Sequence, residues 1–325
     1  MDVGFTLSAE EHPPRELVRL ARIAEDGGFG FAAVSDHFHP WTSRQGQSSF
    51  VWAVIGGIAS TTDRLRVWTT VTCPLIRLHP VIVAQAAATA AAMMPGRFRL
   101  GLGTGENLNE HVTGERWPSA SERRDMLAEA VVVIRELWAG GSVDHEGPHY
   151  RVVDATLFTL PDEPPPIYLA AGGPKAARMA AELADGLITT APDDELLRAF
   201  DEAGGRDKPR LGQLTVCWGQ DDRRARRTAH EWWPNGAIRG ELGQELPLPR
   251  HFEQAAEMVT EDDVAKAVVC GPDPQRHLEA VTRFADAGFD HLVVHQVGPD
   301  PEGGLRFYAS EVLPKVQRTS ARKAG

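Results

Sequence analysis

Short runs of apolar and often β-branched residues alternate with longer stretches of helical spacing along almost the whole chain. The short runs predict eight strands, at residues 3–7, 31–35, 65–71, 97–101, 166–170, 185–190, 211–217 and 291–296. The longer stretches predict the helices between them, including those at residues 15–26, 79–94, 121–138, 174–184, 275–287 and 305–318. Most strand runs lack a regular alternation of apolar and polar residues, which is typical of parallel strands covered by helices.

The number of strand–helix units favours a closed barrel. In a chain of 325 residues, eight such units fit an α/β fold of the (β/α)8 TIM-barrel type better than an open doubly wound sheet. Two segments interrupt the alternation: about 142–165 predicts a small β-excursion, and about 233–259 predicts a helical or irregular insertion. Neither is long enough to be a domain, so we expect residues 1–325 to form one barrel domain with two insertions.

Composition and charge exclude several classes of partner. The chain has 34 Lys and Arg against 45 Asp and Glu, a formal net charge of −11, which argues against binding to a nucleic-acid backbone. The longest apolar stretch, residues 81–94, is interrupted by Gln85 and Thr89 and is too short to span a membrane. The three cysteines form no CxxC motif, which is typical of reduced thiols in a cytoplasmic protein.

Polar or glycine-rich segments follow four neighbouring strands of the predicted barrel. In this fold, reactive residues project from the carboxyl ends of the strands and from the loops after them. The four segments are residues 35–41, 70–74, 101–110 and 170–174. Their convergence on neighbouring strands predicts one site at the barrel mouth.

The first of these segments contains Asp36, His37, His39 and Trp41. A histidine titrates near neutral pH and can act as an acid or a base with little tuning. His37 could also be a core histidine at a strand end. We expect no metal, because His37 and His39 have no cysteine or carboxylate partners at ligand spacing.

Glycines dominate two of the other strand ends. Gly103 and Gly105 precede Glu106, and Gly172 and Gly173 open the helix predicted at 174–184. Glycines allow backbone N–H groups to approach a ligand closely, and helix N-termini attract phosphate. A tight turn is the alternative explanation for the second pair. Together with the acid/base residues, the two segments predict a flat, phosphate-bearing cofactor across the barrel mouth.

The same segments resemble a known family. The matching stretches, in order, are VGFTLSAEEHPPRELV, SDHFHPW, TTVTCP, GLGTGENLNEHVTGERWP, LWAGGSVDHEGPHYRV, IYLAAGGPKAARMAAELADGLITT and HLVVHQVGP. They resemble the luciferase-like oxidoreductases that use the deazaflavin coenzyme F420, in the branch that contains F420-dependent glucose-6-phosphate dehydrogenase. The resemblance implies a β/α barrel with insertions and a homodimer.

The resemblance also implies roles for individual residues. His37 and Glu106 are the acid/base pair, with either as the base, and Trp41 lies beside them over a small-molecule substrate. A non-proline cis peptide is implied between Thr70 and Val71. The residues implied to contact coenzyme F420 are Asp36, Thr70, Val71, Cys73, Thr104, Gly105, Asn109, Gly172 and Gly173.

The substrate cannot be carried over in the same way. Asp193 stands where the sugar-phosphate enzymes have a phosphate-binding lysine, and a carboxylate there would repel a phosphate dianion. Lys266 aligns with a second such lysine. We therefore expect hydride transfer between an alcohol or sugar carbon and C5 of F420, on a substrate left open. The alternatives are an FMN-dependent luciferase-like monooxygenase, a non-catalytic F420-binding protein, and an aldolase or isomerase of phosphorylated sugars.

Overall fold

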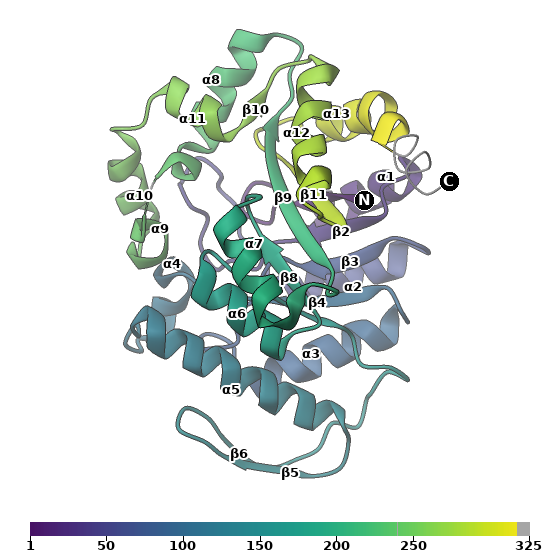
Figure 1. Cartoon of the computed structure of the whole chain (residues 1–325), viewed down its shortest axis with the longest axis vertical. Coiled ribbons are helices and arrows are strands. Elements are labelled where there is room, and N and C mark those ends of the chain that lie inside the picture. The colour runs from purple at the N-terminus through teal and green to yellow at the C-terminus, as the bar shows by residue number, and fades with distance from the viewer. Residues whose placement is uncertain (239, 317–325) are drawn as a thin grey trace.

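The computed structural model describes residues 1–238 and 240–316, and eight parallel strands in this part of the chain close into a barrel (Figure 1). Each strand pairs with the next, and the last pairs with the first. The barrel strands are β1 (Asp2–Leu7), β2 (Phe31–Val34), β3 (Arg66–Thr69), β4 (Phe98–Leu102), β7 (Ile167–Ala170), β8 (Gly186–Thr189), β9 (Arg210–Cys217) and β11 (His291–Gln296). A two-residue strand, β10 (Val269–Cys270), pairs with the end of β9. The predicted (β/α)8 barrel is confirmed.

Helices surround the barrel, and the six predicted helical segments all contain one. The longer helices are α1 (Pro14–Asp26), α2 (Val51–Thr61), α3 (Pro80–Met93), α5 (Ala120–Trp138), α6 (Pro174–Leu183), α8 (Asp222–Trp232) and α12 (Pro274–Asp286). Shorter ones are α4 (Asn107–Glu110), α7 (Asp194–Phe200), α11 (Glu261–Ala267) and α13 (Pro301–Phe307), which continues into a π-helical turn at Tyr308–Val312. The last helix thus begins before residue 305, and its predicted end at Arg318 lies outside the described residues.

Helix α2 was not among the predicted helices because its sequence, VWAVIGGIAST, contains two glycines, which lower helix propensity. Packing explains one of them. A Cβ atom at Gly57 would lie 2.8 Å from a methyl carbon of Val18 in α1. Close contact between α1 and α2 therefore overrides local propensity.

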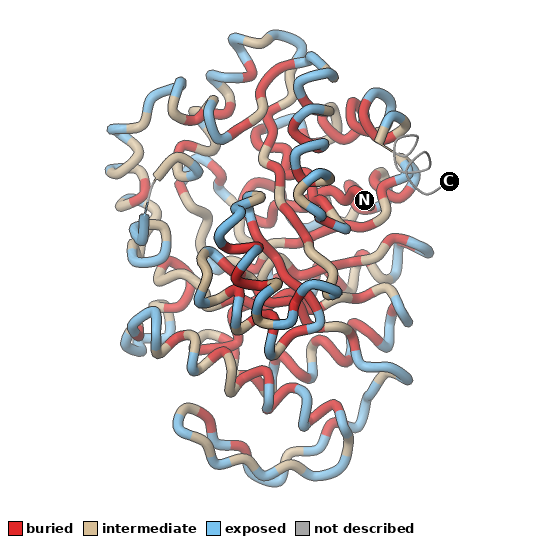
Figure 2. The backbone as a smooth tube through the Cα atoms, in the orientation of Figure 1, coloured by how far each residue is buried: buried red, intermediate tan, exposed pale blue. Residues whose placement is uncertain are grey.

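The core lies on both sides of the barrel wall. Inside the barrel, large side chains from different strands pack together: Phe31, Ala33, Trp68, Tyr168, Ile188, Leu211 and Val293. Outside it, a larger apolar cluster joins the opposite face of the strands to the helices. Figure 2 shows the buried segments gathered in the barrel strands and on the inner sides of the helices. Burial on both faces accounts for strands without alternation.

The two interrupting segments lie apart from each other: the first is at the bottom of Figure 1 and the second at its left side. Residues 142–165 contain an antiparallel hairpin, β5 (Val143–Glu146) and β6 (Arg151–Ala155). Residues 233–259 contain short helices: a 3-10 turn at Pro234–Ala237, α9 (Leu242–Glu245) and α10 (Pro249–Ala256). Helix α9 lies beside α4, so the second insertion is placed close to the barrel mouth.

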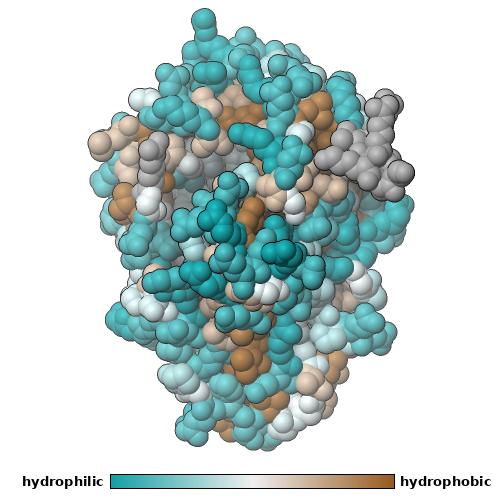
Figure 3. Space-filling model, in the orientation of Figure 1, coloured by the Kyte–Doolittle hydropathy of each residue, from teal (hydrophilic) through white to brown (hydrophobic). Residues whose placement is uncertain are grey.

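The surface is mostly polar. Figure 3 shows a largely hydrophilic face with an apolar strip in its lower half, the part that Figure 1 shows as α5 and the hairpin. Among the described residues, no helix has the length and apolar character needed to cross a bilayer.

Candidate active site

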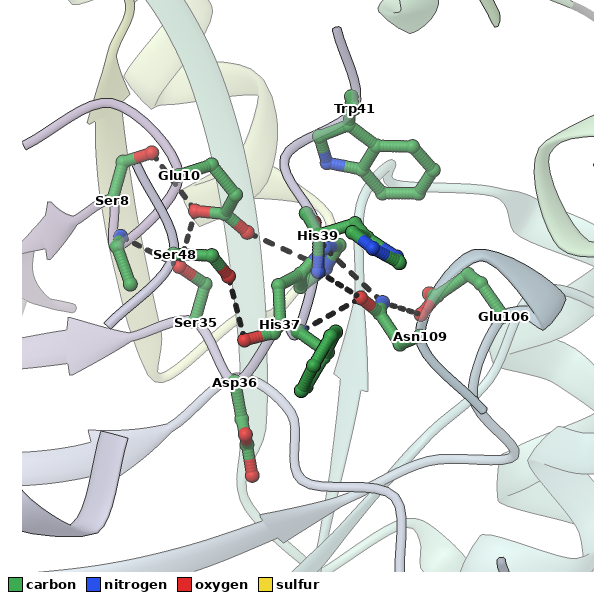
Figure 4. A network of polar contacts seen from close by, with 12 residues as sticks. Ser8, Glu10, Ser35, Asp36, His37, His39, Trp41, Ser48, Glu106 and Asn109 are labelled. Atoms are coloured by element: carbon green, nitrogen blue, oxygen red, sulfur yellow. Dashed lines mark hydrogen bonds and ion pairs between the residues drawn. The ribbon is translucent and has the colours of Figure 1, made fainter. Parts of the chain in front are cut away.

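The acid/base residues predicted from the sequence meet at the carboxyl end of the barrel (Figure 4). His37 lies in the loop after β2, and Glu106 lies directly before α4, in the loop after β4. The side chain of Asn109, in the first turn of α4, lies between them. The side chain of Asn109 therefore joins the loops after β2 and β4, which are far apart in the sequence.

The amide of Asn109 has a fixed orientation. Its oxygen accepts hydrogen bonds from the backbone N–H groups of Phe38 and His39, at 2.9 and 3.1 Å. Its nitrogen must then face the other way, where it donates to Oε2 of Glu106 at 3.2 Å and lies 3.1 Å from Nδ1 of His37.

This orientation determines the tautomer of His37. Because Asn109 presents a hydrogen to Nδ1, that ring nitrogen accepts, and a neutral His37 carries its proton on Nε2. The carbonyl oxygen of His39 lies 3.3 Å from Nδ1 and is the weaker contact at that atom. Nε2 points to the opposite side of the ring.

A glutamate that was not predicted from the sequence lies on that opposite side. Oε1 of Glu10 is 3.4 Å from Nε2 of His37, and Oε2 of Glu10 accepts hydrogen bonds from the hydroxyls of Ser8 and Ser35 at 3.0 and 2.6 Å. Burial acts to raise the pKa of Glu10. Nevertheless, the neighbouring imidazole of His37 and the Ser35 hydrogen bond hold that pKa below its ordinary value. Glu10 follows β1, so the strand-end rule applied to that strand would have found it.

Aromatic rings cover the pair. The ring of Trp41 lies 5.0 Å from that of His37, and Phe252 of α10 packs edge-on against Trp41 at 5.2 Å. His39 donates from Nδ1 to the carbonyl oxygen of Leu108 at 2.9 Å, which ties the loop to α4. The described residues contain no group of three or more His, Cys, Asp or Glu side chains that could hold a metal ion.

Asp36 is bound within the protein. Its two carboxylate oxygens contact the hydroxyl of Thr72 at 2.7 Å and the guanidinium group of Arg77 at 2.8 Å. Glu110 accepts from the backbone N–H of Arg77, and burial raises the pKa of this carboxyl above its ordinary value. Asp36 thus joins the loops after β2 and β3, and its contact with a cofactor stays a prediction.

The loop after β3 has the backbone that the resemblance implies. The peptide between Thr70 and Val71 is cis, as predicted. The hydroxyl of Thr70 is buried and has no hydrogen-bond partner among the described residues. Cys73 is buried too, and burial raises the pKa of its thiol well above the ordinary value, so it stays protonated. A neutral thiol is a weak hydrogen-bonding group.

The glycine-rich segments leave room for a ligand. Apart from their chain neighbours, the described residues place no atom within 4 Å of an ideal Cβ built on Gly172 or Gly173. Gly173 precedes α6, whose N-terminus has no side-chain cap, so its first N–H groups are available to an anion. Thr104 lies partly exposed between Gly103 and Gly105. The unpartnered Thr70 hydroxyl and the open α6 N-terminus fit a flat cofactor with a phosphate-bearing tail.

The two predicted substrate residues make the contacts given for them within their own helices. Asp193 is exposed after β8 and caps α7, because its carboxylate accepts from the N–H of Leu196 at 2.8 Å. Lys266 is exposed on α11 and pairs with Asp263 of the same helix at 3.0 Å. Within residues 1–238 and 240–316, neither makes a hydrogen bond or ion pair with His37, Glu106 or Asn109.

Comparison with known proteins identifies the family. A family model described as luciferase-like monooxygenase matches residues 1–291. An F420-dependent glucose-6-phosphate dehydrogenase from Microbacterium testaceum is 37% identical over 98% of each chain. One from Nocardia farcinica is 35% identical, again over 98% of each chain.

Solved structures agree with this result. An F420-dependent secondary alcohol dehydrogenase, in complex with an F420-acetone adduct, has a TM-score of 0.89 at 30% identity over 96% of this chain and 98% of that one. An F420-dependent tetrahydromethanopterin reductase from Methanopyrus kandleri (TM-score 0.78, 21% identity, 97% and 99% coverage) shows the fold alone. The chain therefore belongs to the luciferase-like family, among its F420-dependent oxidoreductases.

Proposed function

We propose that this protein is an F420-dependent dehydrogenase, which transfers a hydride between an alcohol or sugar carbon and C5 of the deazaflavin ring. The observation that carries the proposal is the pairing of Glu106 and His37 through Asn109 at the barrel mouth. The comparisons support the same proposal, because relatives at 35–37% identity are named F420-dependent dehydrogenases. The lower-identity likeness to monooxygenase structures supports only the fold.

The coenzyme supplies the two-electron chemistry when it is bound. The loop at Thr70 and Val71, the loop at Thr104 and Gly105, and the α6 N-terminus at Gly172 and Gly173 would hold it. Cys73 lies beneath this loop region as a buried neutral thiol.

The protein's own groups handle two protons. In alcohol oxidation, one residue of the pair His37 and Glu106 accepts the hydroxyl proton of the substrate. The other residue of the pair holds a proton of its own. The hydrogen bonds favour Glu106 as the acceptor, because Nδ1 of His37 already accepts from Asn109 and its Nε2 carries the ring proton. Glu10, 3.4 Å from Nε2, stabilises that proton on His37. Such transfers contribute roughly 10²–10⁴-fold to a rate.

The test is a panel of alcohols and sugars, each with and without phosphate, assayed by the loss of F420 absorbance. We expect turnover with at least one of them, and tighter binding of F420 than of FMN or NADP by calorimetry. Oxygen consumption with reduced FMN, together with tighter FMN binding, would instead support the monooxygenase alternative. F420 binding without any turnover would support the non-catalytic one.

We infer further that the protein is a homodimer in the cytoplasm. A groove between α1 and α2 is lined by apolar side chains, including Pro14, Val18 and the exposed Phe50, and supports a surface that a second copy covers. Cys73, Cys217 and Cys270 are all buried free thiols, which suits a reducing compartment. Light scattering after size exclusion tests the dimer, and a monomer at micromolar concentration would contradict it.

A further inference from the structure

A second buried imidazole–carboxylate pair lies next to the first. Nε2 of His295, near the end of β11, is 3.5 Å from Oε2 of Glu11, in the loop after β1. Only 3% of His295 and 5% of Glu11 are exposed. The other carboxylate oxygen of Glu11 accepts from the backbone N–H of Gly298 at 2.9 Å. The pair is therefore held inside the protein by its own loops.

The barrel brings this pair to the candidate active site. Strand β1 lies between β11 and β2, so the loop at Glu10 and Glu11 is flanked by His295 on one side and His37 on the other. Val293 belongs to the cluster inside the barrel, and side chains alternate along a strand, so His295 also faces the interior. Two consecutive buried carboxylates thus each have a separate imidazole.

The hydrogen bonds of the second pair are incomplete. Both ring nitrogens of His295 and Oε2 of Glu11 are buried without a hydrogen-bond partner among the described residues. Trp233, from the second insertion, stands perpendicular to the His295 ring at 4.5 Å. A buried carboxylate beside a second carboxylate is costly unless a positive charge offsets it. No hydrogen bond accounts for the position of His295 beside Glu11, so compensation of the carboxylate's charge explains this contact.

The other titratable groups around Glu11 do not supply this charge. They are His12 of the same loop and Cys217 of β9, which both interact electrostatically with Glu11, and Glu10, its neighbour in the chain. Burial lowers the pKa of His12, which favours its neutral form, and burial raises the pKa of the Cys217 thiol. Among the described residues, the imidazole of His295 lies within ion-pair distance of Glu11, at 3.5 Å, and offsets its charge when the ring is protonated.

We propose that His295 is a positioning residue for the dehydrogenase reaction proposed above: in its protonated form it neutralises Glu11, so that of these two neighbouring carboxylates only Glu10 acts on the protonation of His37. Removal of His295 leaves an extra negative charge beside Glu10. That charge stabilises the imidazolium form of His37, so His37 holds its proton to higher pH.

The test follows the ring signal of His37 by NMR across pH in protein labelled with ¹³C-histidine, without coenzyme. The His37→Ala variant identifies the signal. In His295→Gln we expect the titration midpoint of His37 to rise by about one pH unit, the effect of one nearby charge opposite in sign to the imidazolium. In the double variant Glu11→Gln/His295→Gln, which removes both charges, we expect the midpoint to return to that of the wild type.

His291→Gln is the matched control. It makes the same change on the same face of β11, four residues and about 13 Å away at the other end of the barrel. It should leave the His37 midpoint in place. An unchanged midpoint in folded His295→Gln, or the same shift in the double variant, would overturn the proposal. If His295→Gln does not fold, the double variant Glu11→Gln/His295→Gln decides the matter. Folding of that double variant would support the proposal, and its failure to fold would overturn the proposal.

A wild-type protein without F420-dependent turnover would refute the proposed function, while the NMR titration would still decide the role of His295.

Discussion

The thiol of Cys73 lies directly against the backbone of Gly105. A Cβ atom at Gly105 would be 2.5 Å from Sγ, closer than real Cβ contacts, and the residue has a positive φ of 70°. Two independent constraints, a left-handed backbone and a filled space, therefore require glycine here. The contact ties the loop before Glu106 to the loop after β3.

Gly105→Ala should destabilise the protein by about 2–4 kcal/mol, from the strained φ together with overpacking against Cys73. Chemical denaturation measures this. Gly114→Ala is the control, because Gly114 has φ 81° but no atom within 4 Å of its ideal Cβ; it should cost only about 1–2 kcal/mol. Adding Cys73→Ala to Gly105→Ala should recover part of the loss. Equal losses at both glycines would show that the Cys73 contact is unimportant.

Asn109→Ala should lower kcat at least tenfold, because it releases Glu106 and Nδ1 of His37 together and leaves two backbone N–H groups unpartnered. Steady-state kinetics with F420 measures this. Asn107→Ala is a matched control two residues away, since the side chain of Asn107 donates to the carbonyl of Glu245 in α9 and not to the pair. A wild-type kcat in Asn109→Ala would refute the positioning role.

His37→Ala and Glu106→Gln should each lower turnover by about a hundredfold or more while F420 affinity stays within about tenfold, because both act mainly in proton transfer. Turnover and coenzyme affinity are measured separately, by absorbance and by calorimetry. A histidine with a purely structural role would lower stability and spare the rate per folded molecule. Normal turnover in either folded variant would mean that the acid/base pair is assigned wrongly.

The carboxylate of Glu10 makes the free energy of unfolding depend on pH in the acidic range. Its pKa in the folded protein is held below the ordinary value, so it contributes stability that is present above about pH 4.5 and is lost as the pH falls. Glu10→Gln removes this dependence. The free energy of unfolding should therefore fall less between pH 5 and pH 3 in Glu10→Gln than in the wild type. Equal falls would show that the carboxylate is not stabilised in the folded state.

The sequence is enough to predict several site residues that follow the strands. It is not enough to predict which atoms these residues contact. His37, Glu106 and Asn109 are local in the sequence to their strand ends, and the barrel rule brings them to one place. Glu10 was not predicted although the same rule covers it, because the segment after the first strand, residues 8–13, contains no glycine and a single histidine. The link through Asn109 depends on the orientation of one amide, which no pattern in the sequence specifies.

Asp36 illustrates the other limit. The resemblance implies a cofactor contact, whereas its carboxylate is engaged by Arg77 and Thr72. Arg77 comes 41 residues later in the chain. Such a pairing depends on the path of the loop after β3 and not on the local properties of either residue.

The substrate is the point on which sequence identity and local charge disagree. Relatives at 35–37% identity are named glucose-6-phosphate dehydrogenases. Yet Asp193 and Asp194 lie exposed just beyond β8, in place of the phosphate-binding lysine that the resemblance implies. Asp193 also caps α7, but a capping carboxylate still repels a phosphate dianion. We predict that local charge outweighs overall identity here, because a carboxylate at the position the resemblance gives to the phosphate-binding lysine would repel the phosphate directly.

Glucose 6-phosphate should therefore be a poor substrate, with kcat/KM at least about tenfold below that of a neutral alcohol or sugar, because one lost charge-assisted contact is worth roughly 1.5–3 kcal/mol. Asp193→Lys should narrow or reverse this difference. Asp193→Asn is the matched control, since asparagine retains the capping preference without the negative charge and should give an intermediate value. Asp193→Lys also loses the cap, at about 1 kcal/mol, so stability must be measured alongside. A wild-type preference for the phosphorylated sugar would show that cationic residues elsewhere at the barrel mouth, and not residue 193, determine phosphate recognition.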